Sequence, residues 1–266
     1  MTKNLNRIDL VVENGNTMCE LKATKFKTKM KGTLSLLALI IVVLGCKSPE
    51  GPSITIVDIG KNNRIELGRQ LRIINKYSPK LIVLDFFLDN DSLSVDSILV
   101  KELAKSAPTV QATAVHNFDE QLNSWDSLEV SHSKFKVTYK GYSNITVDDS
   151  IFIPRLPMRQ LFRDDTVLSL SYLAAKNTYG VKKKYAESGT KDVPLLVERY
   201  RRRIKIIARE SLSAGKFKEM DIRGKIVVMG YVGKLEDNFY LDKERSRRIS
   251  GAEIQACIIQ QVMDAE

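Results

Sequence analysis

Short apolar runs recur along this chain, separated by segments in which apolar residues are spaced three or four positions apart. The clearest run extends from Pro79 to Asp91: a proline begins it, apolar residues follow, and acids with an asparagine end it. Such a run, bounded by turn-forming residues, is typical of a strand buried on both faces of a sheet. The segments Ser53 to Gly60 and Thr109 to Val115 are similar and rich in β-branched residues. We therefore predict three strands of one sheet in this part of the chain.

The segments between these strands predict helices. Asn62 or Asn63 can cap the first helix. Its apolar face consists of Leu67, Leu71 and Ile74. Ser92 or Ser94 can cap the second helix, and its apolar face consists of Val95, Ile98, Leu99 and Leu103. A strand, a helix and a second strand imply a parallel pair with a right-handed crossover. The predicted fold class is α/β, a three-layer sandwich around a mainly parallel central sheet.

The second half of the chain is more polar at first and then returns to the same pattern. Lys134 to Tyr139 alternates lysines with apolar residues, which predicts an antiparallel excursion from the sheet. We expect a helix over Val167–Asn177 and strands over Arg203–Ala208 and Ile226–Gly230. The last helix is predicted from about Gly251 to Met263, with Cys257 on its apolar face as a core residue.

An uncharged segment near the amino terminus indicates that the chain is more than a soluble domain. The fifteen residues 32–46 carry no charge, and five lysines precede them from Lys22 to Lys31. Fifteen helical residues span only about 22 Å, short of the ~30 Å hydrocarbon core of a bilayer. A basic region followed by so short an apolar segment indicates a signal peptide or a signal-anchor helix. We therefore expect the chain to divide into a basic segment 1–31, the apolar segment 32–46, a linker 47–52 and an exported domain 53–266.

The residues Val43 to Cys46 resemble a bacterial lipobox, in which the cysteine is lipidated after cleavage. Cys46 is thus a lipidation candidate, and an uncleaved anchor is the alternative. Met30 begins a compact signal peptide of its own, so translation could start there. If translation starts at Met1 instead, Asp9 to Leu21 could form a hairpin around Asn14-Gly15. Either anchor attaches the chain to the bacterial membrane and leaves residues 47–266 in the cell envelope, outside the cytoplasmic membrane.

Composition and charge exclude several classes of function. The net charge of +10 includes seven Lys/Arg and three acids in residues 1–46. The rest of the chain has only a small excess of positive charge for its length, so we expect no nucleic-acid partner. Three widely spaced cysteines and two histidines offer no metal-site spacing and little histidine chemistry. The basic segment from Lys182 to Arg203 indicates either a solvated loop and strand edge or a surface that binds anionic lipid headgroups electrostatically.

The order of elements and two groups of motifs resemble the CHASE type-2 domain, an extracytoplasmic sensory domain of bacterial receptors. The resemblance covers roughly residues 53 to 264. It rests on Ile56–Gly60, Pro79–Asp85, Asp96, Arg223–Tyr231, Glu236-Asp237 and Gly251–Ala256. Two features depart from the family: Leu241-Asp242 replaces its usual Thr-Pro pair, and family members continue into transmembrane helices after this domain. Because this sequence ends at Glu266, right after the last predicted helix, we expect a stand-alone sensory module, a subunit that signals through a membrane partner, or a degenerate remnant.

Acidic residues at strand ends are the candidates for chemistry. Asp85, Asp89 and Asp91 could serve a metal-dependent transferase or phosphatase, but the phosphatase acid–base position holds Phe87. We therefore expect no catalytic residue, metal or cofactor. An unknown small ligand would instead contact Asp58, Asp85, Gly233 and Asp237, which converge if their strands are neighbours. Each acid could equally bond loop amides. The alternatives to a ligand-binding sensor are the exported metal-dependent enzyme and a structural envelope lipoprotein.

Overall fold

The computed structural model describes most of the chain from residue 53 onward and two short strands before it. The described residues are 11–13, 16–18, 53–61, 63–88, 96–145, 155–181, 183–187, 192–233, 238–240 and 247–264. The chain forms two compact units, 1–49 and 50–266. In the first unit, β1 (Val11–Glu13) and β2 (Asn16–Met18) pair antiparallel, which confirms the predicted hairpin. The apolar segment 32–46 and its Cys46 lie outside the described residues.

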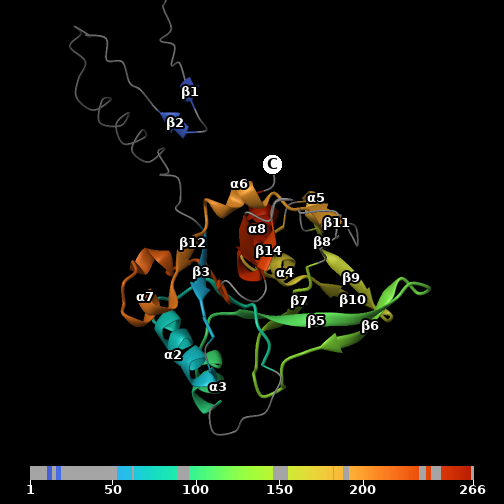
Figure 1. Cartoon of the computed structure of the whole chain (residues 1–266), viewed down its shortest axis with the longest axis horizontal. Helices are drawn as coiled ribbons and strands as arrows, with labels where there is room; N and C mark the ends of the chain where they lie inside the picture. Colours follow the sequence, from blue (N-terminus) through green and yellow to red (C-terminus); the bar gives the residue numbers. More distant parts are fainter. Residues whose placement is uncertain are drawn as a thin grey trace, which may run out of the picture. The chain divides into compact units, whose positions relative to one another are not determined.

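The second unit is built on a nine-stranded, mostly parallel sheet (Figure 1). Its strands are β3 (Ile54–Asp58), β4 (Leu81–Leu84), β5 (Thr109–Asp119), β6 (Ser124–Glu129), β7 (Tyr139–Tyr142), β9 (Arg159–Phe162), β10 (Asp165–Leu168), β12 (Lys205–Ile207) and β13 (Ile226–Gly230). The strand order is β10-β9-β6-β5-β4-β13-β3-β12, and β7 pairs with β5. Two smaller antiparallel pairs join β8 (Arg155–Pro157) to β11 (Asp192–Pro194) and β14 (Asn238–Tyr240) to β15 (Arg248–Ser250).

The position of β13 corrects one prediction. The strands β3 and β4 are parallel, as predicted, but they are not paired with each other, because β13 lies between them and pairs with both. Every residue of β13 is buried. A strand that is apolar on both faces is best placed at the centre of a sheet, where both faces are covered. The helix that follows β3 therefore crosses over an intervening strand.

Helices cover both faces of the sheet. One face carries α2 (Arg64–Asn75), α3 (Ser97–Leu103) and α7 (Arg209–Ser213); the other carries α4 (Leu170–Lys176), α6 (Val197–Arg201) and α8 (Gly251–Asp264). A short helix α5 (Lys183–Ala186) and the turn η1 (Glu219–Asp221) complete the described elements. The mixed α/β class with a mainly parallel sheet, predicted from the run pattern, is confirmed.

Alternation along each central strand explains the two apolar cores. In β4, Leu81 and Val83 join the core beneath α4 and α8, whereas Ile82 and Leu84 join the core beneath α2 and α3. Successive side chains of a strand point to opposite faces, so a continuous apolar run supplies both cores at once. The same division holds in β3 and β13. A thiol on α8, Cys257, is almost fully buried, and burial raises its pKa to about 12, so it is a core residue as predicted.

Two of the predicted helix starts need adjustment. Asn63 caps α2 as predicted: its side-chain oxygen accepts a hydrogen bond from the Glu66 amide at 3.0 Å. The second helix, however, begins at Ser97 with Asp96 at the cap position, and Ser92 and Ser94 lie outside the described residues. The helix predicted from Val167 begins at Leu170, because residues 165–168 form β10 first.

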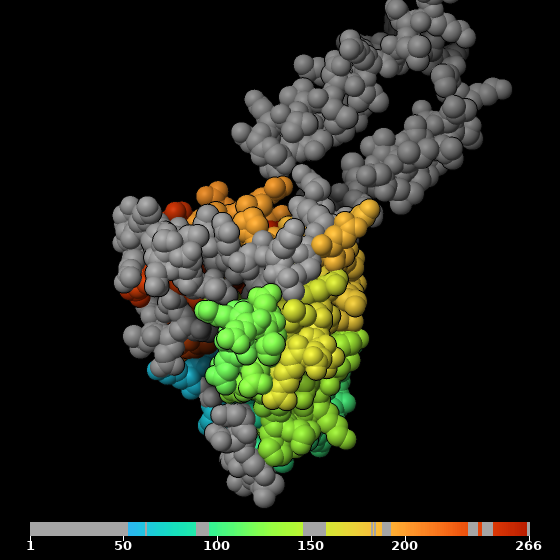
Figure 2. Space-filling view, turned by 90° about the vertical axis from the view of Figure 1, so that its right-hand side faces the viewer, coloured from blue at the N-terminus to red at the C-terminus, as the bar shows by residue number. Residues whose placement is uncertain are grey.

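The predicted antiparallel strand over Lys134–Tyr139 is wrong. Residues 133–138 form turns and irregular backbone, and β7 begins only at Tyr139 and runs parallel to β5. The alternation has another cause, since Phe135 is buried while Lys134 reaches Asp96. The antiparallel excursion exists elsewhere, in the β5–β6 hairpin and the β9–β10 pair. Figure 2 shows this hairpin in green beside the yellow strands β9 and β10.

The basic segment between Lys182 and Arg203 also differs from the loop and strand edge that its composition indicated. It contains α5, β11 and α6, and Arg201 in α6 bonds Glu253 of α8 at 2.9 Å. Part of this charge therefore holds two helices together. Among the described residues, no helix combines the length and apolar composition needed to cross a membrane.

Candidate functional site

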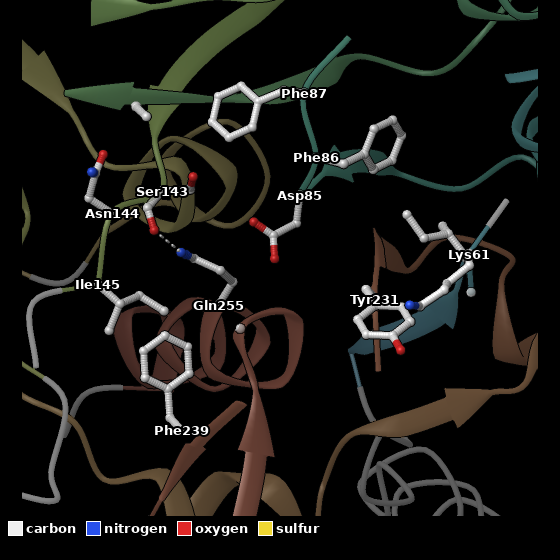
Figure 3. A pocket seen from close by; sticks show the side chains of 14 residues that line it. Lys61, Asp85, Phe86, Phe87, Ser143, Asn144, Ile145, Tyr231, Phe239 and Gln255 are labelled. Carbon is white, nitrogen blue, oxygen red and sulfur yellow. Dashed lines mark hydrogen bonds between the residues drawn. The ribbon is translucent and has the colours of Figure 1, made fainter. Parts of the chain in front are cut away.

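A cleft of about 610 Å³ opens at the carboxyl ends of the central strands (Figure 3). Ligands of open α/β sheets commonly bind at this edge. The described residues that line the cleft follow β3, β4, β7 and β13 or belong to β5, β14 and α8. They are Ile59, Gly60, Lys61, Asp85, Phe86, Phe87, Ala114, Ser143, Asn144, Ile145, Tyr231, Phe239, Gly251 and Gln255. The cleft thus gathers segments that are far apart in the sequence.

Asp85 lies in the centre of this cleft, directly after β4 (Figure 3). Its amide donates a hydrogen bond to the Met229 carbonyl at 2.9 Å, which holds the residue against the end of β13. A glycine ends β13 at position 230, where a Cβ atom would lie 2.6 Å from the Cβ atom of Ala252 and 3.3 Å from that of Asp85. Glycine is therefore required for the first turn of α8 to approach β13 this closely. The ends of β4 and β13 therefore lie side by side at this edge of the sheet.

Asp58 reaches the same edge of the sheet but has a different environment. Its Oδ1 atom accepts hydrogen bonds from the amides of Gly60, at 3.0 Å, and Val232, at 3.1 Å. These bonds tie the turn after β3 to the loop after β13, and Asp58 is not among the residues lining the cleft. The acid therefore shapes the wall of the cleft through loop amides; a direct contact between its carboxylate and a ligand stays a prediction.

A third predicted site residue, Gly233, does not line this cleft. Gly233 lines a second cleft of about 450 Å³, together with Arg201, Arg248, Glu253 and neighbouring residues. Asp237 lies outside the described residues, as do Asp89 and Asp91, on which the metal-dependent alternative rests. Within the described part of the chain, no group of three or more histidines, cysteines and acids is placed to hold a metal ion.

Polar side chains on the α8 side of the cleft are held in place by the protein itself. Gln255 donates a hydrogen bond to the Ser143 carbonyl at 3.0 Å and accepts one from the Ser171 hydroxyl on α4. The side chain of Asn144 bonds both the amide and the carbonyl of Val115, at 2.8 and 3.1 Å. Gln255 therefore connects the cleft to α4, α8 and the end of β7.

The start of α8, which forms the floor of the cleft at Gly251, is fixed by a capping box. The Ser250 hydroxyl accepts a hydrogen bond from the Glu253 amide at 3.2 Å, and the Glu253 carboxylate accepts one from the Ser250 amide at 3.0 Å. The other carboxylate oxygen of Glu253 bonds Arg201 of α6. The residues Gly251 to Ala256, on which the family resemblance partly rests, thus have a structural explanation: they position this helix start against β13.

Sequence reasoning missed several residues of the cleft. Lys61 follows the end of β3 and could have been found by the rule that located Asp85. Ser143 and Asn144 could not, because β7 was predicted in the wrong place. Phe239 and Gln255 come from a short strand and from the buried helix α8, and no local pattern sets such residues apart from the core.

Comparison with known proteins identifies a family. A family model described as the CHASE2 domain matches residues 27–266, a range that includes the apolar segment 32–46. No curated protein and no solved structure matches the chain. The match confirms the resemblance drawn from the motifs, and CHASE2 domains are extracytoplasmic sensory domains. With this match over most of its length, the chain belongs to the CHASE2 domain family.

Proposed function

We propose that this chain is a membrane-tethered, extracytoplasmic sensory domain that binds a small ligand and signals through a partner in the membrane. The cleft at the carboxyl ends of β3, β4 and β13 is the observation that carries the proposal. Its volume of about 610 Å³ falls in the range of about 300–1,000 Å³ usual for small-molecule sites. Its walls combine aromatic rings with a few polar groups, as such sites usually do.

Contacts around α8 supply a route from the cleft to the rest of the domain. Residues Gly251 to Val262 of this helix are buried, so the helix cannot move without repacking one of the two cores. Gln255 lines the cleft and bonds both Ser171 of α4 and the Ser143 carbonyl. A ligand that binds one arrangement of α4 and α8 better than another would shift the population toward it, and the membrane partner would read that shift.

The tether is proposed from the amino-terminal segment. Lysines precede the apolar residues 32–46, which keeps the amino side cytoplasmic and residues 47–266 on the outer side of the membrane. Lipidation of Cys46 would attach the domain after cleavage, whereas an uncleaved segment would anchor it directly. Either tether keeps the domain next to the membrane, where a signalling partner could contact it.

Thermal unfolding of the purified full chain with a panel of envelope metabolites and ions tests the ligand site. A ligand present at a hundred times its dissociation constant adds about 2.7 kcal/mol of stability, which corresponds to a rise of roughly 5–10 °C in Tm for a domain of this size. We expect Ile145→Trp, which places an indole in the cleft, to abolish the rise. Met220→Trp adds the same ring at an exposed position and should leave the rise intact.

Two results would count against the sensor. One is a panel in which no compound raises Tm, combined with no membrane protein captured by cross-linking in the envelope. The other is a ligand whose effect on Tm is the same in Ile145→Trp and in the unsubstituted chain, because that ligand would bind outside the cleft.

The lipid tether has a separate test. Metabolic labelling with a clickable fatty acid should mark the full chain, and Cys46→Ala should remove the label completely. Cys19→Ala, which changes a cysteine of the basic segment 1–31, should retain it. Label that persists in Cys46→Ala would refute lipidation at this residue, and an unlabelled parent chain would favour the uncleaved anchor.

A further inference from the structure

Resting on the proposed ligand site, we propose that the cleft recognises a zwitterionic amino acid with an apolar side chain. Asp85 would bind the ammonium group, Lys61 would bind the carboxylate, and the aromatic and aliphatic residues of the cleft would enclose the side chain. The inference follows from which charges line the cleft, which polar groups are already engaged there, and where the apolar surface lies.

The described lining of the cleft contains two charged side chains of opposite sign. Asp85 follows β4 and is partly buried, whereas Lys61 follows β3 and is exposed. Each also has polar interactions of its own, so a ligand would join or replace an existing partner. The strands that they follow, β3 and β4, flank β13 and are therefore about 9–10 Å apart at the usual strand spacing, and Lys61 lies three residues beyond the end of β3. A lysine side chain is long enough to bring its ammonium group across part of this gap.

The uncharged polar side chains of the cleft are less suited to recognising a ligand. Both polar atoms of Asn144 bond the backbone of β5, and both ends of the Gln255 amide bond Ser143 and Ser171. A ligand that competed for these atoms would break bonds that hold β5, β7, α4 and α8 together. The two charged residues, together with the Tyr231 hydroxyl, therefore carry most of the polar recognition that the described lining can offer.

Apolar side chains lie on both sides of Asp85, and Lys61 lies on one of these sides. In Figure 3, Phe87, Ile145 and Phe239 lie on the side of Gln255, while Phe86 and Tyr231 lie on the side of Lys61. From the Gln255 side toward Lys61, the lining offers an apolar surface, an acid and a base, which would bind the side chain, ammonium and carboxylate of an amino acid. Aromatic rings near Asp85 would also favour a cation, since their faces attract positive charge.

Ligands with a single charge fit this lining less well. A simple amine would satisfy Asp85 but bring nothing to Lys61, and a simple carboxylate would satisfy Lys61 but place its charge near Asp85. Each would lose one charge-assisted hydrogen bond of about 1.5–3 kcal/mol, which is roughly 10- to 100-fold in affinity. Discrimination of this kind, by a group left unmatched, is an effective source of specificity.

Two matched sets of compounds test the inference by calorimetry on the full chain. The first is L-phenylalanine, phenethylamine and 3-phenylpropionate; the second is L-leucine, 3-methylbutylamine and 4-methylpentanoate. Within each set the apolar group is constant and only the charges differ. We expect an amino acid to bind at least roughly tenfold more tightly than its amine and acid analogues. These compounds require no substitution, so the comparison holds even if a variant fails to fold.

Substitutions test which residue binds each charged group of the ligand. In Asp85→Asn the amino acid should lose roughly tenfold or more and bind no better than the acid analogue, because the ammonium has lost its partner. In Lys61→Met the amino acid should instead bind no better than the amine analogue. Asp126→Asn and Lys205→Met remove the same charges outside the cleft and should leave every affinity unchanged.

The results that would overturn the inference differ from those that would overturn the sensor. Equal affinity for an amino acid and either analogue, or affinities unmoved by Asp85→Asn and Lys61→Met, would show that the charges do not select the ligand. If neither set binds but another class raises Tm in a manner that Ile145→Trp abolishes, this inference fails and the sensory function stands. If nothing binds in the cleft at all, both fail.

Discussion

Replacement of Asp96 by asparagine is expected to lower the free energy of unfolding by about 3–5 kcal/mol, the usual cost of removing one partner from a buried ion pair. The Asp96 side chain is 3% exposed and bonds Arg64 Nη1 at 3.0 Å, and it also contacts the Lys134 ammonium. The two cations are only 17% and 19% exposed. Without the carboxylate, both charges would stay largely desolvated and would repel each other.

The consequences should extend beyond the pair, because Asp96 joins three segments. Arg64 begins α2, Asp96 precedes α3, and Lys134 belongs to the loop that bonds Leu88, through the Ser131 hydroxyl at 2.9 Å and the His132 amide at 2.9 Å. Leu88 follows the cleft residues Phe86 and Phe87. Loss of Asp96 would therefore loosen the backbone that carries one wall of the cleft.

Urea unfolding of the purified chain measures the effect of Asp96→Asn. The matched control is Asp126→Asn, which removes an acid whose partner Arg163 lies 3.2 Å away with both side chains about two-thirds exposed. Exposed pairs contribute about 0–1 kcal/mol, so this control should be close to the parent. Equal stability of the two variants would mean that burial does not strengthen the Asp96 contacts, contrary to what its position indicates.

Replacement of Glu253 by alanine is expected to lower the free energy of unfolding by about 2–4 kcal/mol, from a lost cap and a lost charge-assisted hydrogen bond. One carboxylate oxygen accepts bonds from the Ser250 amide and hydroxyl at 3.0 and 3.1 Å, and the other bonds Arg201 at 2.9 Å. Ser250 is 1% exposed, so its amide would be left buried without this acceptor. The first turn of α8, and with it Gly251 in the cleft, should fray.

Two measurements identify this cause. Hydrogen exchange should accelerate at the first turn of α8 in Glu253→Ala before it does so elsewhere in the domain. Glu198→Ala removes an acid paired with Arg247 at 2.8 Å, both about half exposed, and should change neither stability nor exchange appreciably. A loss of stability in Glu253→Ala with unchanged exchange at α8 would argue against the capping role.

The candidate site shows how far local sequence information reaches. Asp85 was located correctly because it ends an apolar run, and a parallel strand presents its carboxyl end at a known edge of the sheet. Asp58 was also placed at that edge, yet its bond to the Val232 amide depends on a loop more than 170 residues away. The partners of a side chain are set by packing between distant segments, which residue types alone do not encode.

Strand order is the second example. The apolar runs identified β3, β4 and β13 individually, but nothing in them indicated that the last of the three would insert between the first two. Lys134 to Tyr139 misled for a related reason. An alternating pattern predicts a half-buried strand. Here the pattern arises because the Phe135 ring is buried, whereas the Lys134 ammonium forms an ion pair with Asp96.

The sequence by itself determined the family, the α/β class, the central strands and the buried last helix, because each follows from motifs or from apolar periodicity within a short stretch. The tertiary structure alone decided the strand order and the hydrogen bonds that Asp58 and Gln255 make within the protein. It also decided that Asp85, Lys61 and Phe239 line the same cleft. Periodicity reports which face of an element is buried. Which elements meet at that face depends on the joint packing of two cores, and only the folded chain resolves it.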